Sequence, residues 1–423
     1  MKILTLAPYA YFKGCKNFEN NQSGLAYMIT DIVNGLAESN DVCILTQSSI
    51  TNGNKYNKIR IIRRRWIDIF SNIKFSYIRI MNKALNNVKL KFSYKLKCVL
   101  YFLSGGYAEQ VIKKEKPDIV HIHSLGFYTL PFIMACVRSK VPFAVTLHGL
   151  ISLSDSVKAD YKQKNLEPNF LRLAQEKNIP VSVISTGIKN RIEEQLGVNS
   201  RTISVILNTV DENILIADEE KIKEIKSLYN ITQNKKVILC IGGISERKNQ
   251  LQVLRAFYLL DEQVKQNTVL LYIGSGDLNE TLKQEINKLN LNDKVFMCGK
   301  ILRKDMCNYY SLADLNVTAS IDEGFGLPML EAYQYGVPTV TFKDLDAVLD
   351  IYNDQTMITV NERTDQALSD GLLEGLKKEW DRDFIISFSK NFTFNKMSDE
   401  YNAFLSNVKL SNTTILDVEN LVK

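Results

Sequence analysis

The sequence predicts an α/β protein built from two doubly wound, Rossmann-like domains. Short apolar runs alternate with amphipathic stretches along all 423 residues, and such alternation is typical of parallel sheets covered by helices on both faces. The alternation is interrupted once, at about 209–225, and a second series begins near 236. We therefore expect an N-terminal domain over 1–210, a C-terminal domain over 211–385, and a last helix and tail over 386–423.

Each expected strand is a short apolar run, and each expected helix repeats its apolar residues at a period near 3.6. The expected strands are 2–7, 41–46, 118–122, 143–147, 181–185 and 203–207, followed by 236–241, 269–273, 294–297, 314–318 and 338–342. The helical patterns include 24–39, 108–116, 187–196, 249–260, 279–289, 304–312 and 328–335.

Composition narrows the class of protein. The chain has no run of about 18 apolar residues, the length that a membrane-spanning helix needs. The apolar run that follows Met1 is too short for a secretion signal and suits a buried first strand. The seven cysteines include no Cys-x-x-Cys pair, which favours reduced thiols. We expect a cytoplasmic protein that contacts the inner face of the plasma membrane if its basic segment docks there.

Positive charge is concentrated in residues 55–103, which we call the basic segment. It holds 13 Lys and Arg against one acid, Asp68, and leaves 40 basic and 46 acidic residues in the rest of the chain. Arg63, Arg64, Arg65 and Trp66, followed by a Lys- and aromatic-rich helix, suit an anionic membrane surface. A solvated insertion is an alternative interpretation. Nucleic-acid binding is a third, but no nucleic-acid motif supports it, so we expect none.

The most informative stretch is 319–340, which contains Glu-Gly-Phe-Gly-Leu-Pro-Met-Leu-Glu-Ala. Its two carboxylates, Glu323 and Glu331, are separated by seven residues that include two glycines and Pro328. The proline suits the first turn of a helix, where free N–H groups bind anions such as a diphosphate. Carboxylates beside them can accept hydrogen bonds from sugar hydroxyls. Phosphate donors and hydroxyl acceptors together suit a nucleotide sugar.

This stretch resembles the Glu-x7-Glu motif of the retaining GT-B glycosyltransferases of group one (family 4). The resemblance implies two Rossmann-like domains that face each other across a cleft, with a C-terminal helix that crosses back to the N-terminal domain. It also implies that Glu323 contacts the donor sugar and Glu331 holds the ribose. Backbone amides of Phe325, Gly326 and Leu327 would lie against the sugar and phosphates.

Gly242-Gly243-Ile244-Ser245-Glu246-Arg247-Lys248 follows an expected strand and precedes a helix. A glycine turn, two cations and a helix N-terminus can form a diphosphate cradle. The stretch resembles the family's Gly-Arg-x(n)-Lys segment, and Lys248 matches its Lys. Gly243 stands where the family has Arg, so we expect Arg247 to substitute for it.

Weaker resemblances place further residues at the donor site. Gly274, in Gly-Ser-Gly at the end of the next strand, resembles a turn beside the nucleotide, although a simple tight turn is an equal alternative. Ile301 follows the strand after that, where the family holds the base. Ser23-Gly24 resembles the family's Gly-Gly loop, so Gly24 is expected near the donor.

The chain contains three histidines, and all of them fall near the ends of expected strands. One hypothesis is a three-histidine zinc site, since His121 and His123 share one face of a strand. The resemblance instead implies a structural role for the Asp-Ile-Val-His-Ile-His strand. It makes His148, in Thr-Leu-His-Gly, the residue that contacts the donor sugar.

Asp344-Leu345-Asp346 is an Asp-x-Asp string of the kind that binds a metal in GT-A transferases. Here it follows a C-terminal-domain strand, so we expect no metal role for it. GT-B sites use Arg, Lys and a helix dipole in place of a metal. We therefore expect no metal and no cofactor.

Together these observations predict transfer of a sugar from a UDP- or GDP-linked donor to a hydroxyl of a glycan or polyprenyl-linked acceptor. The catalytic residues would be His148, Arg247, Lys248 and Glu323. Synthesis of a cell-surface polysaccharide is the expected setting. Two alternatives stay open: a nucleotide-sugar epimerase or hydrolase of the same fold, and a degenerate transferase that serves as a binding subunit.

Overall fold

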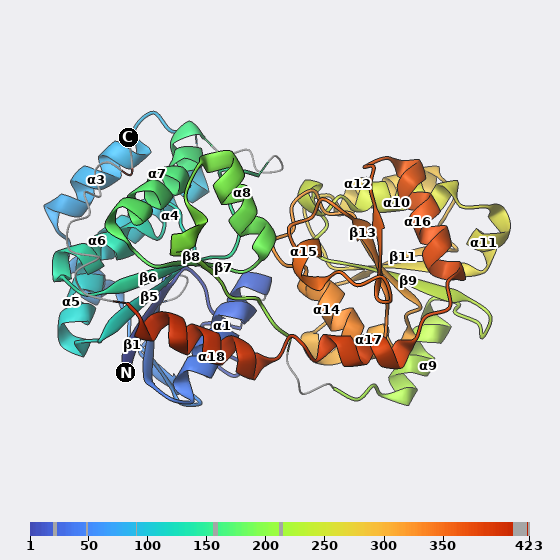
Figure 1. Cartoon of the computed structure of the whole chain (residues 1–423), viewed down its shortest axis with the longest axis horizontal. Helices are drawn as coiled ribbons and strands as arrows, with labels where there is room; N and C mark the ends of the chain where they lie inside the picture. The colour runs from blue at the N-terminus through green and yellow to red at the C-terminus, as the bar shows by residue number, and fades with distance from the viewer. Residues whose placement is uncertain are drawn as a thin grey trace. The chain divides into compact units, whose positions relative to one another are not determined.

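The computed structural model describes residues 1–19, 23–47, 50–89, 91–154, 160–210, 215–408 and 421 (Figure 1). The chain divides into two compact units. The first unit comprises 1–208 together with 394–423, and the second comprises 209–393. Residues 211–214, which include the expected start of the C-terminal domain, and 409–420 of the expected tail lie outside the described residues.

The first unit is built on an eight-stranded sheet in the order β3-β4-β2-β1-β5-β6-β7-β8. All neighbouring pairs are parallel except β3 and β4. The strands are β1 (Lys2–Ala7), β2 (Asp41–Thr46), β3 (Asn54–Tyr56), β4 (Ile59–Ile61), β5 (Ile119–His123), β6 (Phe143–Leu147), β7 (Val181–Val183) and β8 (Ile203–Val205). Strands β5 and β6 are wholly buried, as expected for central strands of a sheet covered on both faces.

Helices surround this sheet, and part of the basic segment contributes to them. They are α1 (Gly24–Ala37), α2 (Trp66–Phe70), α3 (Phe75–Leu85), α4 (Phe92–Leu103), α5 (Gly105–Glu115), α6 (Leu130–Ser139), α7 (Tyr161–Lys177), α8 (Thr186–Leu196) and the short η1 (Ser200–Thr202). The basic segment is therefore folded as most of β3, as β4 and as the helices α2 to α4, so the Lys- and aromatic-rich helix expected after Trp66 is divided into three helices.

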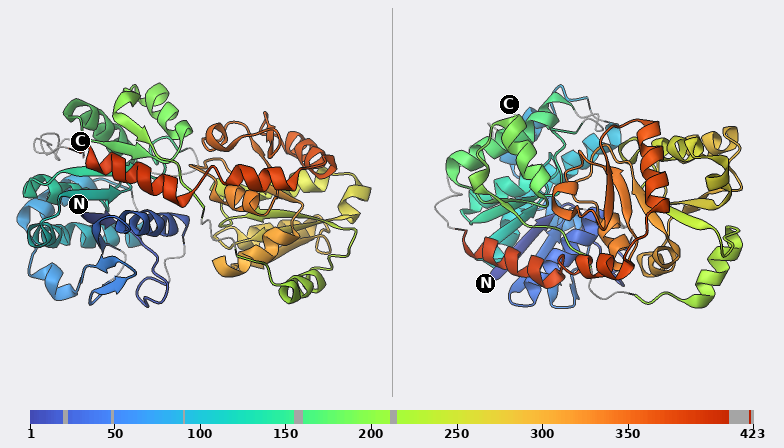
Figure 2. Two further views of the ribbon diagram at one scale, coloured as in Figure 1. Left: turned by 60° about the horizontal axis from the view of Figure 1, so that its bottom comes forward. Right: turned by 45° about the vertical axis from the view of Figure 1, so that its right-hand side comes forward.

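The end of the described chain returns to the first unit. Helix α18 (Phe394–Ser406) lies alongside α1 (Figure 2). Contact is close at Gly35, because a Cβ there would lie 2.9 Å from Cβ of Ser398. The side chains of Asn40 and Asn402 are hydrogen-bonded at 2.7 Å. These contacts give the helix a docked position on α1.

The second unit is a six-stranded parallel sheet in the order β11-β10-β9-β12-β13-β14. Its strands are β9 (Lys236–Ile241), β10 (Thr268–Ile273), β11 (Val295–Gly299), β12 (Leu315–Thr318), β13 (Thr339–Phe342) and β14 (Met357–Val360). Its helices are α9 (Glu219–Leu228), η2 (Glu246–Lys248), α10 (Gln250–Leu259), α11 (Glu262–Gln266), α12 (Asn279–Lys288), η3 (Arg303–Asp305), α13 (Met306–Leu312), α14 (Leu327–Gln334), α15 (Val348–Ile351), α16 (Asp365–Lys377) and α17 (Arg382–Ser389).

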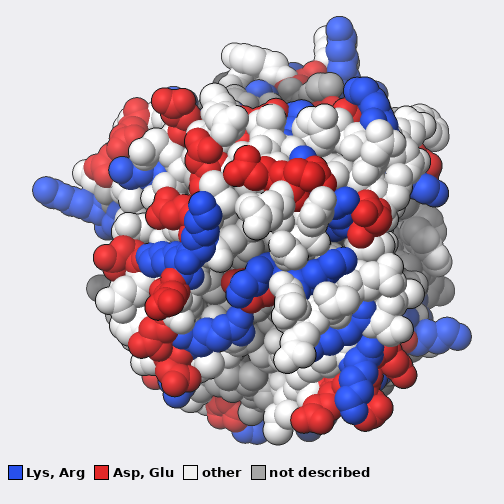
Figure 3. Space-filling model, turned by 90° about the vertical axis from the view of Figure 1, so that its right-hand side faces the viewer, with Lys and Arg blue, Asp and Glu red and all other residues white. Residues whose placement is uncertain are grey.

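All the strands expected from the sequence occur, and their order confirms two Rossmann-like parallel sheets. The structure adds β3, β4 and β14, whose short runs carry a weak apolar signal. On the face of the molecule seen in Figure 3, acidic and basic side chains are interspersed. None of the described helices is both long and apolar enough to cross a bilayer.

Candidate functional site

The site begins at the carboxyl ends of three neighbouring strands in the second unit. Gly242 follows β9, Gly274 follows β10 and Gly299 ends β11, and all three have positive φ (+146°, +138° and +69°). The N–H of Gly274 donates to the carbonyl of Gly299 at 2.8 Å, and a Cβ on Gly274 would lie 2.0 Å from the Gly242 oxygen. Glycine is therefore required at 274. This edge of an open α/β sheet is where ligands bind.

The turn after Gly242 is held by its own side chains. The N–H of Ser245 donates to Oε1 of Gln250 at 3.2 Å, and Nε2 of Gln250 donates to the carbonyl of Gly243 at 3.1 Å. The Ser245 hydroxyl accepts from the N–H of Lys248 at 3.4 Å. These bonds fix the backbone that carries Arg247 and Lys248. Gly243 itself is exposed, and a Cβ there would meet only the Ser275 oxygen, at 3.6 Å.

Lys248 and Glu323 form an ion pair between this turn and the loop after β12. Their side chains are only 12% and 13% exposed. The hydroxyl of Ser320 also donates to Oε2 of Glu323, at 3.2 Å. Burial opposes ionisation of Glu323, but the charges of Lys248 and Arg247 outweigh it and lower its pKa below the ordinary value. Glu323 is therefore an ionised carboxylate with an ammonium beside it.

Two further bonds join the same turn and loop. Nη1 of Arg247 donates to the carbonyl of Asp322 at 2.9 Å, and the carbonyl of Arg247 accepts from the N–H of Ile321 at 2.8 Å. Arg247 is exposed, so its guanidinium retains donors that face solvent. The structure thus brings Arg247, Lys248 and Glu323 together, as the sequence predicts.

Helix α14 begins directly after this loop. Gly326 is its N-cap with φ +75°, and a Cβ there would lie 2.0 Å from Cε of Met329. Leu327 and Pro328 begin the first turn. Pro328 has no N–H, and the N–H of Met329 donates to the carbonyl of Gly326 at 2.8 Å, so the N–H of Leu327 is the one that the start of the helix can offer to a ligand. The side chain of Phe325 is buried and packs edge-on against Phe392, with ring centroids 6.4 Å apart. Phe325 therefore anchors the loop through its ring.

Glu331, in α14, has a separate set of partners. Its Oε2 accepts a hydrogen bond of 2.8 Å from the hydroxyl of Tyr310, whose ring stacks on Tyr335 at 5.4 Å. Burial raises the pKa of Glu331, while the charge of Arg303 and the Tyr310 bond oppose this rise. Ile301 follows the end of β11, where it is partly buried against the hydrophobic core of the second unit.

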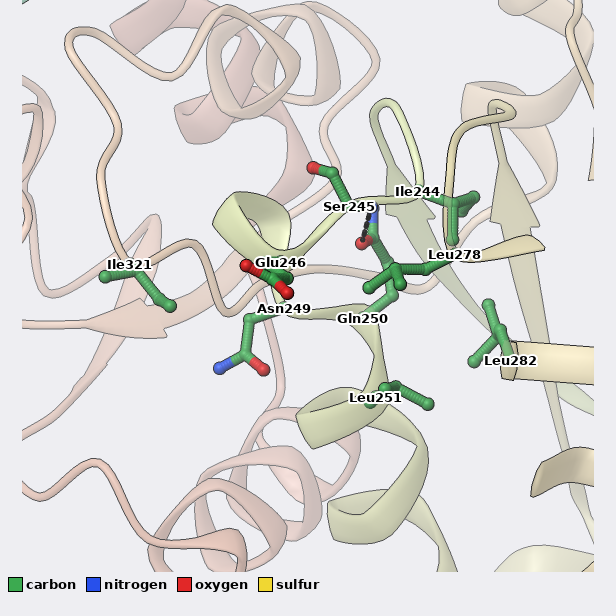
Figure 4. Close-up of a pocket in the computed structure, with 9 residues that line it drawn as sticks. All are labelled: Ile244, Ser245, Glu246, Asn249, Gln250, Leu251, Leu278, Leu282 and Ile321. Carbon is green, nitrogen blue, oxygen red and sulfur yellow. Dashed lines mark hydrogen bonds between the residues drawn. The ribbon is translucent and has the colours of Figure 1, made fainter. Parts of the chain in front are cut away.

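A cavity of about 340 Å³ lies beside the turn (Figure 4). Its wall is largely aliphatic and consists of Ile244, Leu251, Leu278, Leu282 and Ile321. The polar groups come from Ser245, Glu246, Asn249 and Gln250. Lys248 does not line it. This cavity is therefore distinct from the Lys248–Glu323 pair, although both use the 244–251 turn.

Gly24 lies in the first unit as the first residue of α1. The preceding Ser23 is the N-cap, and its hydroxyl accepts from the N–H of Ala26 at 3.2 Å. A Cβ on Gly24 would meet nothing within 4 Å, so no packing requires glycine there. The three residues before Ser23 lie outside the described part of the chain.

The three histidines form one cluster in the first unit, with ring centroids 4.1 Å apart for His121 and His123 and 5.3 Å apart for His123 and His148, and with tilted rings. Nε2 of His121 is hydrogen-bonded to Oγ1 of Thr146 at 2.7 Å, and Nδ1 of His123 to Nε2 of His148 at 3.0 Å. Burial lowers the pKa of His121 to about 3 and that of His148 to about 4, and it lowers the pKa of His123 as well. All three are neutral at pH 7.

The zinc hypothesis for these histidines finds no geometry to support it. Within the described residues, no group of three or more His, Cys, Asp or Glu side chains is placed to hold a metal ion. His123 and His148 are instead bonded to each other through ring nitrogens.

Three residues of the site escaped the sequence interpretation: Tyr310, Ser320 and Arg363. Arg363 forms a two-point ion pair with Asp344 at 2.7 and 2.8 Å, which gives the Asp-x-Asp string a partner on another strand end. Tyr310 occupies a position that reads as an ordinary apolar position of α13. Ser320 lies only three residues before Glu323, but Tyr310 is 21 residues from Glu331 and Arg363 is 43 residues from Ser320, so no local pattern could have linked those two side chains to the site.

Two family models match the chain. Residues 23–214 match "Glycosyltransferase Family 4" and residues 221–392 match "Glycosyl transferases group 1", so together they account for most of the chain.

Relatives point the same way. N-acetyl-alpha-D-glucosaminyl L-malate synthase of Bacillus anthracis is 25% identical over 55% of this chain and 58% of its own length. UDP-Gal:alpha-D-GlcNAc-diphosphoundecaprenol alpha-1,3-galactosyltransferase of Escherichia coli is 29% identical over 55% of this chain and 59% of its own length. The chain thus spans less than two thirds of the length of these two relatives.

A solved structure extends the comparison to nearly the whole chain. The Anabaena protein HepE, in complex with UDP and glucose, covers 96% of this chain and 99% of its own, with a TM-score of 0.64 and 16% identity. That likeness supports the fold. The two parallel-sheet units and the two family models, which together match most of the chain, show that this chain belongs to the group 1 family of GT-B glycosyltransferases.

Proposed function

We propose that this enzyme transfers a sugar, with retention of anomeric configuration, from a nucleoside diphosphate sugar to a hydroxyl of a glycan or lipid-linked acceptor. The observation that carries the proposal is the shielded Lys248–Glu323 pair at the carboxyl edge of β9. A cation there can neutralise a diphosphate, and the neighbouring carboxylate can accept hydrogen bonds from sugar hydroxyls. The relatives support this choice, because their names specify sugar transfer and one specifies a UDP-galactose donor.

Binding of the donor would separate the Lys248–Glu323 ion pair and give each side chain a group of the donor as its new partner. In the structure, Lys248 neutralises Glu323. A bound diphosphate would attract the Lys248 ammonium and the exposed Arg247 guanidinium, which leaves the carboxylate of Glu323 to the sugar. The N–H of Leu327 at the start of α14 would add a further anion donor. Glu331 would hold the ribose hydroxyls, with Gly274 and Ile301 beside the nucleotide.

The chemical step would break the bond between the anomeric carbon and the diphosphate oxygen and form a bond to the acceptor oxygen on the same face. The acceptor's proton passes to the leaving phosphate oxygen, so no enzymic nucleophile is needed. Negative charge grows on the diphosphate as the bond breaks. Lys248 and Arg247 would stabilise that charge, which is usually the largest contribution to catalysis. His148 would bind a sugar oxygen.

The lipid-linked acceptor class favours docking on a membrane, and one surface suits it. Trp66, Ile67, Phe70, Ile73 and Phe75 are 39–78% exposed, and the rings of Trp66 and Phe70 stack at 5.8 Å. We call residues 66–75 the apolar ledge. It lies within the basic segment, but its flanking cations Arg63, Arg65 and Lys74 are paired with Asp68 and Glu109, so the exposed apolar side chains would carry the contact and anionic headgroups would compete for those cations. We propose that this ledge touches the membrane in a peripheral contact.

The experiment that tests the proposed function is a titration with UDP-, GDP- and ADP-linked sugars in the presence of EDTA, followed by a transfer assay. We expect one donor series to bind and Lys248→Met to reduce turnover. Lys288→Met is the matched control, since Lys288 is 71% exposed and pairs with Glu285 on its own helix. Proton NMR of the product reports the anomeric configuration.

Each other outcome identifies an alternative. Donor consumption that needs no acceptor would indicate an epimerase or hydrolase. Absence of binding by any donor would indicate a degenerate binding subunit. Activity lost in EDTA and restored by a divalent cation would show that a metal is needed. An inverted product would contradict retention.

A further inference from the structure

The loop that carries Glu323 is held from two sides. On one side it is bonded to the turn of Arg247 and Lys248, as described above. On the other side, Nη1 of Arg363 donates to the carbonyl of Ser320 at 3.0 Å. Ser320 is fully buried, and its hydroxyl donates to Oε2 of Glu323. A short chain of contacts therefore connects Arg363 to the carboxylate of Glu323.

Arg363 is itself strongly constrained. Its Nε and Nη2 donate to the two oxygens of Asp344 at 2.7 and 2.8 Å, and its guanidinium lies 4.6 Å from the ring centroid of Phe342. Its carbonyl accepts from Nε2 of Gln252 at 3.0 Å. These contacts leave the guanidinium with one orientation, in which Nη1 points at the carbonyl of Ser320.

The topology explains why these residues meet. Ser320 follows β12, Asp344 follows β13 and Arg363 follows β14, and these three strands are neighbours in the sheet. Their carboxyl ends lie at the same edge as the ends of β9 and β10. The Arg363–Asp344 pair thus contacts the Ser320–Glu323 loop from the side of β13 and β14, whereas Arg247 and Lys248 contact it from the side of β9.

We propose that the Arg363–Asp344 pair is a positioning device that fixes the Ser320–Glu323 loop, and so sets the orientation of Glu323 toward the donor sugar. An isolated ion pair with an acid as exposed as Asp344, at 58%, adds little to stability. Its role in positioning comes from its geometry, because one planar guanidinium bridges a carboxylate and a backbone carbonyl. A lysine ammonium has no planar fork and cannot make the same two contacts. This inference rests on the proposed role of Glu323 in sugar binding.

The test compares two ligands that differ only in the sugar. We expect Arg363→Gln and Asp344→Asn to bind the bare nucleoside diphosphate as the wild type does. Both should bind the corresponding nucleotide sugar more weakly, by roughly tenfold, because a displaced carboxylate costs affinity steeply. Arg363→Lys should lie between the wild type and Arg363→Gln. Isothermal titration calorimetry measures both dissociation constants.

Arg255→Gln is the matched control. Arg255 forms a two-point pair with Asp365 at 2.6 and 3.3 Å, also in the second unit, but that pair bonds α10 to α16 rather than to the loop. We expect this variant to bind both ligands as the wild type does. The double variant Asp344→Asn/Arg363→Gln should lose no more than Arg363→Gln alone, because the two residues act as one unit.

Specific results would overturn the inference. Equal loss of affinity for both ligands would indicate general damage to the site, and unchanged affinity for the sugar-bearing ligand would remove the positioning role. If Arg363→Gln does not fold, Asp344→Asn decides by the same two criteria. A wild type that binds no nucleotide sugar would refute the proposed function instead, which separates the two failures.

Discussion

The hydroxyl of Tyr310 donates a 2.8 Å hydrogen bond to the carboxylate of Glu331, across 21 residues of sequence. The Tyr310 ring is fixed by stacking on Tyr335, so the bond fixes Glu331 in turn. Oε2 of Glu331 is thereby occupied, and we propose that Oε1 accepts from the ribose. This relationship defines how the proposed ribose contact is oriented.

Tyr310→Phe should therefore weaken nucleotide binding without affecting chemistry. We expect the KM for the donor to rise roughly threefold to tenfold, the usual worth of one hydrogen bond, with kcat unchanged. Steady-state kinetics with varied donor concentration measures both. Tyr309→Phe, on the same helix, is the control and should leave the donor KM unchanged. A fall in kcat at constant KM would contradict the orienting role.

The Lys248–Glu323 pair allows stability and catalysis to be separated. Lys248→Met removes a charge that acts on the leaving diphosphate, so kcat should fall by about 10²–10³. It also leaves the shielded Glu323 carboxylate without its main partner, which should lower the free energy of unfolding by about 1–3 kcal/mol.

The double variant Lys248→Met/Glu323→Gln should recover most of that stability, because no unpaired charge remains, yet it should stay inactive. Urea unfolding and turnover assays on the same preparations measure the two effects. Recovery of activity along with stability would show that Lys248 serves only to neutralise Glu323.

Donor affinity should depend on pH through Glu331. Protonation turns one oxygen of the carboxylate into a donor and removes its charge, and burial raises the pKa of Glu331 above its ordinary value. The KM for the donor should therefore rise as pH falls through that raised pKa. A donor analogue without ribose hydroxyls should show no such rise, and neither should Glu331→Gln. An equal acid limb for the analogue would place the titrating group elsewhere.

Membrane contact should depend on the apolar ledge. Trp66→Ala/Phe70→Ala should release the protein from vesicles that contain phosphatidylglycerol, because the variant loses the apolar area that enters the lipid interface. Co-sedimentation measures the bound fraction, with pure phosphatidylcholine vesicles as the charge control. Leu349→Ser removes an apolar side chain that is 61% exposed in the second unit, and it should bind as the wild type does. Equal binding by the ledge variant would exclude this surface.

The structure corrects one part of the membrane interpretation. The sequence suggested that Arg63, Arg64 and Arg65 meet lipid together, but Arg64 is buried and donates to the carbonyl of Gln47 at 2.8 Å and to Ser104 at 3.2 Å. Arg63 and Arg65 pair with Asp68. Arg64 therefore has a structural role and is not available to lipid. The sequence could not show this, because the partners that allow Arg64 to be buried are distant from it along the chain.

The sequence located the residues that stand in short motifs next to strand ends. The structure places Lys248 and Glu323 in contact at that edge and Glu331 in the helix that follows, while their roles stay predictions. Arg363 and Ser320 are 43 residues apart, and only the sheet order makes them neighbours. Tyr310 carried no signal, because the phenol of a core tyrosine looks the same in sequence whether or not it orients a carboxylate.

The cluster of neutral histidines affects how many protons the protein takes up near neutral pH. No histidine of the chain gains charge near neutrality, since all three have lowered pKa values. Burial raises the pKa of all seven cysteines, so their thiols stay protonated. Imidazoles and thiols therefore add almost no buffering capacity between pH 6 and 8. The attraction of the basic segment for an anionic surface would thus vary with salt far more than with proton concentration.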